Sequence, residues 1–257
     1  MTVSLQDKAK AFGALHRKGD PVVLFNAWDS GSARTVAEAG AKAIATGSYS
    51  VALANGFSDG ETLPLDLVLA NAARIASAVS LPVTLDFESG YADDPAAIAH
   101  NIGAVMDAGI AGANIEDQVI GRKRLRPAKE QAERLSAVRR AAEAKGVPFF
   151  INARTDVFLQ APRETHSAAL LADALARGRA YAEAGASGLF LAGLVDPTLI
   201  REACAASPLP VNILMMAGAP SVAELRALGV ARISYGGGPY RTAMAALKEA
   251  ATAALTA

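Results

Sequence analysis

The chain has 257 residues, of which 52% are hydrophobic and 19% are charged, and this composition excludes an intrinsically disordered protein. Basic and acidic residues both number 25, so the formal net charge is zero and no overall attraction to nucleic acid or to an anionic membrane is expected. The single cysteine, Cys204, excludes an internal disulfide framework and favours a cytoplasmic protein. No apolar run reaches the roughly 20 residues of a membrane span.

Short apolar runs alternate along the chain with longer segments of helical periodicity. Residues 4–18 come first and are expected to form an extra N-terminal helix. The apolar runs are typical of parallel strands buried on both faces, and they fall at residues 22–25, around 44, and at 82–85, 113–115, 149–151, 188–191, 211–214 and 232–234. Between them, a stripe such as Ile98, Ile102 and Val105 predicts an amphipathic helix.

About eight such units favour an α/β fold closed into a (β/α)₈ TIM barrel rather than an open sheet. Glycines at positions 40, 109, 146, 185 and 229 each follow a helical segment and precede a strand, where a glycine commonly ends a helix. Because no linker rich in proline, glycine and serine interrupts the pattern, residues 1–257 are expected to form one barrel domain.

Polar side chains gather where the predicted strands end, which is where barrels of this kind carry their sites. The motifs at these ends are Asn26-Ala27-Trp28-Asp29, Thr46-Gly47-Ser48-Tyr49-Ser50, Asp86-Phe87-Glu88, Glu116-Asp117-Gln118 and Asn152-Ala153-Arg154-Thr155-Asp156, and Asn212 lies in the seventh strand. The sequence therefore predicts a polar, acidic site at one end of the barrel.

Asp86, Glu88 and Glu116 are expected to lie close together on adjacent strands. Neighbouring carboxylates repel one another unless a cation lies among them. Oxygen ligands without histidine or cysteine suit Mg²⁺ or Mn²⁺, and Mg²⁺ keeps several waters, so some of these carboxylates would bind it only through water. The alternative is that each acid caps a helix or pairs with a surface base.

Arg154 lies among these acids. Its guanidinium could hold a substrate carboxylate or a developing enolate, or could simply form a salt bridge to Asp156 or Glu116. Gly47 and Ser48 could offer backbone N–H groups to an anionic substrate. The basic segment 118–127, which carries Arg122, Lys123, Arg124 and Arg126, is either a loop that closes over the ligand or a solvated loop.

Known motifs of other classes are missing from the sequence. It contains neither a P-loop motif nor the G-x-S-x-G nucleophile motif. Aromatic residues are few and are not interleaved with basic ones, so nucleic-acid binding is not expected.

Taken together, the strand-end motifs at 26–29, 86–91, 114–118 and 152–156 and the segment Asn55-Gly56-Phe57-Ser58-Asp59-Gly60-Glu61 resemble, in order, the isocitrate lyase/phosphoenolpyruvate mutase superfamily. The likeness spans nearly the whole chain. It implies a barrel whose last helix is often exchanged between subunits, in a homodimer or homotetramer.

The resemblance also implies roles for individual residues. Mg²⁺ would lie near Asp86, with Asp59, Glu88 and Glu116 in its inner or outer shell. Gly47, Ser48 and Arg154 would hold the substrate carboxylate or enolate oxygen, and Trp28 and Asn212 would line the substrate pocket. Arg154, Asp59 and Glu116 would be the catalytic residues. Members share a step in which Mg²⁺ and arginine stabilise an enolpyruvate-like intermediate while a bond to C3 breaks.

Two departures from the family pattern narrow the expected activity. The third strand ends Asp86-Phe87-Glu88, where many members have Asp-x-Asp. The loop after the fourth strand reads Gly121-Arg122-Lys123-Arg124-Leu125-Arg126, and it lacks the cysteine and histidine that isocitrate and methylisocitrate lyases carry there. The chain thus resembles the phosphonomutase-like branch and should not be an efficient isocitrate lyase.

The interpretation we favour is an enzyme that cleaves a carbon–carbon bond at C3 of a small, oxaloacetate-like 2-oxo or 2-hydroxy acid, because loss of CO₂ needs no proton donor for the leaving group. Phosphonopyruvate hydrolysis or the phosphoenolpyruvate mutase reaction remains an alternative. A protein that binds 2-oxo acids or dicarboxylates without turnover is the non-enzymatic alternative.

Overall fold

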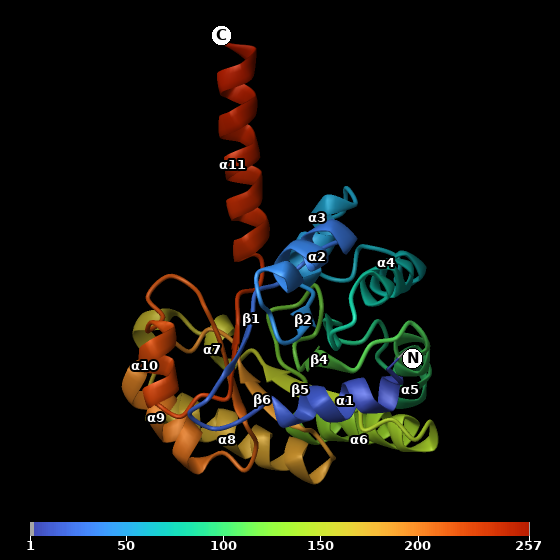
Figure 1. Ribbon diagram of the computed structural model, residues 1–257. Coiled ribbons are helices and arrows are strands. Elements are labelled where there is room, and N and C mark those ends of the chain that lie inside the picture. Colours follow the sequence, from blue (N-terminus) through green and yellow to red (C-terminus); the bar gives the residue numbers. More distant parts are fainter. Residues whose placement is uncertain (1–2, 257) are drawn as a thin grey trace.

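Eight parallel strands form the centre of the computed structural model, which describes residues 3–256 (Figure 1). Neighbouring strands follow the order β1-β8-β7-β6-β5-β4-β3-β2. The strands are β1 (Val22–Leu24), β2 (Ile44–Ala45), β3 (Val83–Asp86), β4 (Gly112–Glu116), β5 (Phe150–Thr155), β6 (Gly188–Leu191), β7 (Val211–Leu214) and β8 (Arg232–Ser234). All eight strands were predicted from the apolar runs.

Helices follow the strands in alternation, so the protein is a (β/α)₈ barrel as predicted. They are α1 (Leu5–Ala14), α2 (Ser30–Glu38), α3 (Ser48–Ala54), α4 (Leu65–Ala78), α5 (Pro95–Asp107), α6 (Ala128–Ala144), α7 (Val157–Gln160), the 3₁₀ turn η1 (Arg163–Thr165), α8 (Ala168–Glu183), α9 (Pro197–Ala206), α10 (Val222–Ala227) and α11 (Gly238–Leu255). The five glycines expected to end helices all have positive φ, between 66° and 95°, which confirms their role.

The ring closes between β1 and β2 through a single parallel bridge rather than a ladder. Ala27 pairs with Thr46, and the Ala27 N–H donates to the Ala45 carbonyl at 2.8 Å. The buried side chain of Asn26 reinforces the closure, because its Nδ2 donates to the Thr46 carbonyl and its Oδ1 accepts from the backbone N–H groups of Tyr235 and Gly236. One amide thus ties together the ends of β1, β2 and β8 at the edge where the site was predicted.

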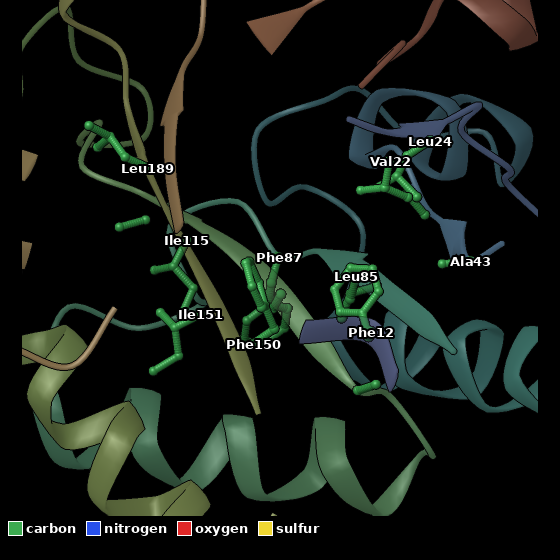
Figure 2. Close-up of a cluster of buried hydrophobic side chains, with 14 of the residues drawn as sticks. Phe12, Val22, Leu24, Ala43, Leu85, Phe87, Ile115, Phe150, Ile151 and Leu189 are labelled. Atoms are coloured by element: carbon green, nitrogen blue, oxygen red, sulfur yellow. The ribbon is translucent and has the colours of Figure 1, made fainter. Parts of the chain in front are cut away.

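The extra N-terminal helix, α1, packs against the opposite end of the barrel. It is shorter than the predicted segment 4–18: the Ser4 side chain caps its first turn and the helix ends at Ala14. Phe12 is fully buried and meets the Phe150 ring edge-on at 5.4 Å, while His16, just beyond the helix, stacks on the same ring at 3.8 Å. Figure 2 shows Phe12 and Phe150 among the aliphatic side chains of the core.

Helix α11 does not pack on the barrel; it projects away from it (Figure 1). In a (β/α)₈ barrel the last helix covers the junction of the last and first strands. That place is instead a groove of about 360 Å³ between α2, β1 and α10, whose lining includes Val22, Val23, Phe25 and Val36. Phe25 remains 43% exposed there. Among the described residues, no helix has the length and apolar character needed to cross a membrane.

Candidate active site

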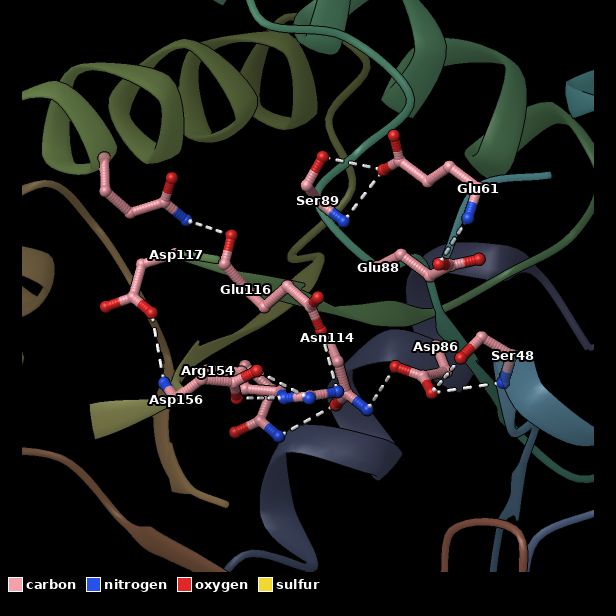
Figure 3. A network of polar contacts seen from close by, with 12 residues as sticks. Ser48, Glu61, Asp86, Glu88, Ser89, Asn114, Glu116, Asp117, Arg154 and Asp156 are labelled. Atoms are coloured by element: carbon pink, nitrogen blue, oxygen red, sulfur yellow. Dashed lines mark hydrogen bonds and ion pairs between the residues drawn. The ribbon is translucent and has the colours of Figure 1, made fainter. Parts of the chain in front are cut away.

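Strand register brings the predicted strand-end residues together. Asp86 is paired with Asn114, Asn114 with Asn152, and Glu116 with Arg154. Paired residues in a parallel sheet project from the same face, and every second residue along a strand shares that face. The Asn-x-Glu of β4 and the Asn-x-Arg of β5 therefore form two adjacent rows of polar side chains. Figure 3 shows Asn114, Glu116 and Arg154 beside Asp86.

A cleft of about 270 Å³ opens at this end of the barrel. Its polar wall includes Ser48, Asp59, Asp86 and Arg154, from the predicted set. Its other lining residues are Asn26, Tyr49, Asn114, Phe190, Leu214, Met215, Met216, Ser234, Tyr235, Gly236, Gly237 and Arg241. The cleft is thus acidic on the side of β2 and β3 and largely apolar on the side of β6 and β7.

Asp86 is the best-supported carboxylate of the cleft. Its Oδ2 accepts hydrogen bonds from both the backbone N–H and the hydroxyl of Ser48, each at 3.1 Å, and its Oδ1 accepts from Asn114 Nδ2 at 3.3 Å. The Ser48 N–H, predicted to bind substrate, therefore binds Asp86 here. These donors hold the carboxylate in one orientation facing the cleft.

Asp59 and Glu88 flank Asp86. The side chain of Asp59 is exposed, but its partial desolvation, followed by repulsion from Asp86, raises its pKa above the ordinary value. Burial, with the charges of Asp59 and Asp86, raises the pKa of Glu88 to about 8. Glu88 lies behind Asp86 in a small adjoining cavity, where its carboxylate accepts from the Glu61 N–H at 2.6 Å and the Tyr91 hydroxyl at 3.2 Å.

This set of oxygens suits a divalent cation. Burial and carboxylate repulsion raise the pKa of Asp59 and of Glu88 beside Asp86, and a cation among the three carboxylates would offset this repulsion. Within residues 3–256, no three acidic, histidine or cysteine side chains form a ready-made coordination site. An ion that keeps most of its waters and takes few protein ligands directly, as Mg²⁺ does, fits this spacing better than one that needs a closed cage.

Arg154 is held by two carboxylates at once. Its Nη1 lies 2.7 Å from Glu116, and its Nε and Nη2 donate to Asp156 at 2.6 Å and 2.8 Å. Burial opposes the charge of Arg154, but Glu116 and Asp156 outweigh it and raise the pKa of Arg154. Both salt bridges considered from the sequence exist: Nε and Nη2 hydrogen-bond to Asp156, and Nη1 forms an ion pair with Glu116.

A buried network fixes Asp156 in turn. The Asp156 N–H donates to Asp117 Oδ1 at 3.1 Å, and Asp117 Oδ2 accepts from the Tyr181 hydroxyl at 2.8 Å and from Arg177. Both aspartates are fully buried. Asp117, which ends β4 in sequence, is therefore a support for the arginine rather than a residue of the cleft.

Glu116 differs from the other predicted metal-site acids because its partner is Arg154. Burial, only partly opposed by Arg154, raises the pKa of Glu116 well above its ordinary value. It does not line the cleft. Its place beneath the guanidinium is compatible with the outer shell that the resemblance implied, and this role stays a prediction.

Two predicted pocket residues lie off the cleft. The Trp28 ring meets Tyr240, at the start of α11, edge-on at 5.2 Å, and the Trp28 carbonyl accepts from Asn71. Asn212 is fully buried and bonded to Ser234, which does line the cleft. Their roles in substrate binding stay predictions.

Several cleft residues were not anticipated from the sequence. Arg241 lies in the first turn of α11 with its guanidinium 5.6 Å from the Tyr49 ring centre. Phe190 lies 5.8 Å from the Arg154 guanidinium. The glycine run 236–238 marked the approach to Arg241, but nothing in the sequence showed that the turn would place this side chain over the cleft.

The basic segment 118–127 is only partly the loop that was considered. Arg122, Lys123 and Arg124 are exposed, and Gln118 and Leu125 bridge to close the segment into a hairpin. Arg126 is buried and binds Asp93 and Glu130. It therefore anchors the segment and is not available to a ligand.

Cys204 lies far from the cleft, in α9. It is buried, and burial raises the pKa of its thiol to about 11. It borders a different pocket together with His16 and Lys18. None of the described residues that line the cleft is a cysteine or a histidine.

A (β/α)₈ barrel with acids, amides and a doubly paired arginine at the carboxyl ends of its strands has the architecture of a barrel enzyme acting on a small anion. The family model for phosphoenolpyruvate phosphomutase matches residues 12–255. The chain belongs to this family, within the isocitrate lyase/phosphoenolpyruvate mutase superfamily, as the motifs predicted.

The relatives of this chain are named for several different activities. The chain is 50% identical to a protein described as a candidate phosphonomutase from Burkholderia cenocepacia J2315, with a TM-score of 0.95, 98% of this chain and 100% of that one covered. It is 32% identical to 2-methylisocitrate lyase of Escherichia coli K12, covering 91% and 79% of the two chains. It is 26% identical to oxaloacetate decarboxylase 2 of Pseudomonas fluorescens, covering 96% and 84%. These relatives are lyases and mutases, which supports an enzyme.

The elevated pKa of Glu88 has a consequence for stability. Because the pKa is about 8 when folded and near 4.5 when unfolded, the folded chain favours the protonated carboxyl. In metal-free buffer, the stability that the protonated Glu88 carboxyl contributes relative to the ionised form is fully present below about pH 4.5. It is lost as the pH rises through about 8. We expect Glu88→Gln to flatten the pH dependence in this window and to add up to a few kcal/mol at pH 9.

Urea unfolding of both proteins in EDTA at several pH values measures this difference. Glu133→Ala, at an exposed helix position, serves as the control. Parallel stability curves for the wild type and Glu88→Gln would contradict the assignment.

Proposed function

We propose that this chain is a divalent-metal-dependent lyase that cleaves the C3–C4 bond of an oxaloacetate-like 2-oxo acid through an enolate of a pyruvate-type product. The observation that carries the proposal is Arg154, which is paired with both Glu116 and Asp156 and lines a cleft together with Asp86, with no cysteine or histidine among the described lining residues. Such a fixed donor stabilises the negative charge that develops on an enolate oxygen.

The acids of the cleft would hold the cation. Asp86 would be its main ligand, with Asp59 and Glu88 contacting it directly or through water, and when bound it would supply Lewis acidity beside the 2-oxo group. Ser48 and Asn114 keep the Asp86 carboxylate oriented. Arg154 would hold the carboxylate or the enolate oxygen of the substrate.

The apolar side of the cleft suits the loss of CO₂. When the C3–C4 bond breaks, its electron pair passes into the enolate, CO₂ departs as a neutral molecule, and C3 then takes a proton. Phe190, Met215 and Met216 offer an apolar wall with no ionic partner for a departing carboxylate. A poorly hydrated wall favours conversion of a carboxylate into neutral CO₂.

Arg241 would hold a second anionic group of the substrate. It lines the same cleft as Arg154 and lies over the Tyr49 ring. Two arginines in one small cleft match a diacid, because each guanidinium can bind a carboxylate through two parallel hydrogen bonds. A 2-oxo diacid such as oxaloacetate has two carboxylates to offer.

Carbon–phosphorus chemistry is the second candidate, supported by the family match and by the 50% identical relative described as a candidate phosphonomutase. Phosphonopyruvate has the same 2-oxo acid end, and its phosphonate could also bind Arg241. Against this candidate, the segment from Gln118 to Pro127 contains no asparagine or threonine that could contact a phosphoryl group in the cleft.

A substrate panel with an acid-deletion variant separates these possibilities. We expect wild-type protein with Mg²⁺ to release pyruvate from oxaloacetate faster than from phosphonopyruvate, and Asp86→Ala to lose at least about a hundredfold in kcat/KM while keeping its fold, because it removes the main cation ligand. Pyruvate and phosphate release are measured with and without EDTA.

The matched control is Asp66→Ala, at an exposed position on α4. Phosphate release exceeding CO₂ loss would favour the phosphorus candidate. No turnover of any 2-oxo acid, with binding retained, would favour a binding protein.

The geometry of Arg154 gives a second prediction. Lysine in its place keeps one charge. It cannot bind Asp156 through two parallel N–H groups, pair with Glu116 and also reach a substrate in the cleft. We expect Arg154→Lys to lower kcat/KM by about 10²–10³-fold, mostly through kcat. Steady-state kinetics test this, with the exposed Arg140→Lys as the control; a change below about threefold would make Arg154 structural.

We further propose that α11 packs on a second copy of the chain and that the protein is a homo-oligomer. The helix exposes Met244, Leu247 and Leu255, and Pro239 is its only residue buried among those described. The apolar groove over β1 lacks the helix that a barrel normally packs there. The helix of one copy and the groove of another are complementary in character.

Leu247→Glu tests this arrangement, because it places a charge on the apolar face of α11 at a position 61% exposed in the single chain. We expect a dimer or larger species for wild type and a shift toward monomer for the variant, measured by light scattering after size exclusion. Glu249→Lys, at an exposed position on the opposite side of the same helix, is the control. A monomeric wild-type protein would refute the proposal.

A further inference from the structure

Three residues with left-handed backbone lie together beside the candidate active site. Within the described chain, the non-glycine residues with positive φ are Glu61 at 57°, Glu88 at 49° and Tyr91 at 55°. Such conformations are unfavourable for side-chain-bearing residues and persist where surrounding contacts enforce them. Glu61 lies in the loop after α3, while Glu88 and Tyr91 lie in the loop after β3.

The same three residues are bonded to one another. The Glu61 N–H donates to Glu88 Oε2 at 2.6 Å, and the Tyr91 hydroxyl donates to Glu88 Oε1 at 3.2 Å. The Tyr91 N–H donates to Glu61 Oε1 at 2.9 Å. Glu61 Oε1 also accepts from the N–H and hydroxyl of Ser89, at 2.9 Å and 2.7 Å, as Figure 3 shows. The side chain of each glutamate thus binds the backbone of the other loop.

The loop after β3 is the fixed side of this contact. The fully buried guanidinium of Arg134, from α6, donates to the carbonyls of Ser89, Ala92 and Asp93. Gly90 cannot carry a side chain, since a Cβ there would meet Ile98 at 2.3 Å. This loop is therefore held from beneath by the barrel, independently of Glu61.

The loop after α3 has much less support. Positions 53–56, 58, 59 and 62 are exposed, and buried apolar packing resumes only at Leu63. Asp59 lies two residues before Glu61 and faces the cleft. The four bonds between Glu61 and the β3 loop are the densest polar contact that the exposed segment makes.

We propose that Glu61 is a positioning residue whose carboxylate docks the Asp59-bearing loop onto the β3 loop, so that Asp59 at the cleft and Glu88 in the adjoining cavity are held as one unit. The docking itself is independent of the substrate; its effect on turnover rests on the proposed function. The charge on Glu61 matters because hydrogen bonds to a carboxylate are roughly twice as strong as neutral ones.

Four variants separate the carboxylate from the backbone conformation. Glu61→Ala removes the carboxylate and keeps a side chain at positive φ. Glu61→Gly removes the carboxylate but tolerates positive φ without strain. Glu61→Gln keeps an acceptor oxygen without the charge, and the exposed Glu133→Ala is the control.

Amide hydrogen exchange by mass spectrometry reads out docking without substrate. In Glu61→Ala and Glu61→Gly we expect exchange in residues 55–63 to rise about tenfold or more, with the barrel strands unchanged, and in Glu61→Gln a smaller rise. If the wild type turns over a 2-oxo acid, kcat should fall in the same order while Tm stays near the wild-type value.

Unchanged protection of residues 55–63 in both Glu61→Ala and Glu61→Gly would overturn the proposal. Exchange that rises equally across the barrel would also overturn it, because Glu61 would then support the fold generally. Restored protection in Glu61→Gly alone would assign the effect to backbone strain and reject the carboxylate. Local exchange that changes as expected in a protein without turnover would leave the docking intact and count against the proposed function instead.

Discussion

Repulsion among carboxylates at the ends of β2 and β3 is the constraint to which the rest of the site responds. The charge of Asp86 adds to desolvation in raising the pKa of Asp59 and of Glu88, and carboxylates placed together in this way need compensation. The structure compensates with donors: Ser48 and Asn114 on Asp86, and the Glu61 N–H on Glu88. These donors orient the carboxylates but do not cancel the repulsion among them, which a bound cation would do under the proposed function.

On the other side of the cleft the buried charge is positive, and it requires acidic partners. Arg154 is surrounded by Glu116 and Asp156, and Asp156 by a second layer ending in Arg177 and Tyr181. Arg154 is thus paired with Glu116 and Asp156, and Asp117 with Arg177, so each of these charges has a partner of opposite sign. Under the proposed function, a guanidinium held in this way would need little reorganisation when an enolate forms.

Much of this arrangement follows from sequence alone. The eight strands, the helix-ending glycines and the convergence of Asp86, Glu116 and Arg154 all derive from periodicity and from the parallel register of a barrel. Such reasoning works because each residue is fixed by its own strand. The same reasoning predicted an N-terminal helix that was too long. A helical pattern does not show that the helix ends at Ala14, which lets His16 stack on Phe150.

Residues whose positions depend on the conformation of a loop could not be predicted in this way. Glu61 and Arg241 gain their positions from backbone conformations that no periodicity encodes, and Arg126 was grouped with exposed cations although its partners, Asp93 and Glu130, bury it. Trp28 shows the same limit, since its partner Tyr240 belongs to a helix that leaves the barrel.

The left-handed residues connect stability with function. Each of Glu61, Glu88 and Tyr91 costs on the order of 1–3 kcal/mol relative to a relaxed backbone. Charge-assisted bonds to Glu61 and Glu88 offset part of this cost, and the buried Arg134 supplies more. This strain is confined to the two loops that carry candidate metal-site acids. It would not help a protein that needed only a stable barrel. It is understandable if the acids must be held close together against their repulsion, since a relaxed loop would let Asp59 move away from Asp86.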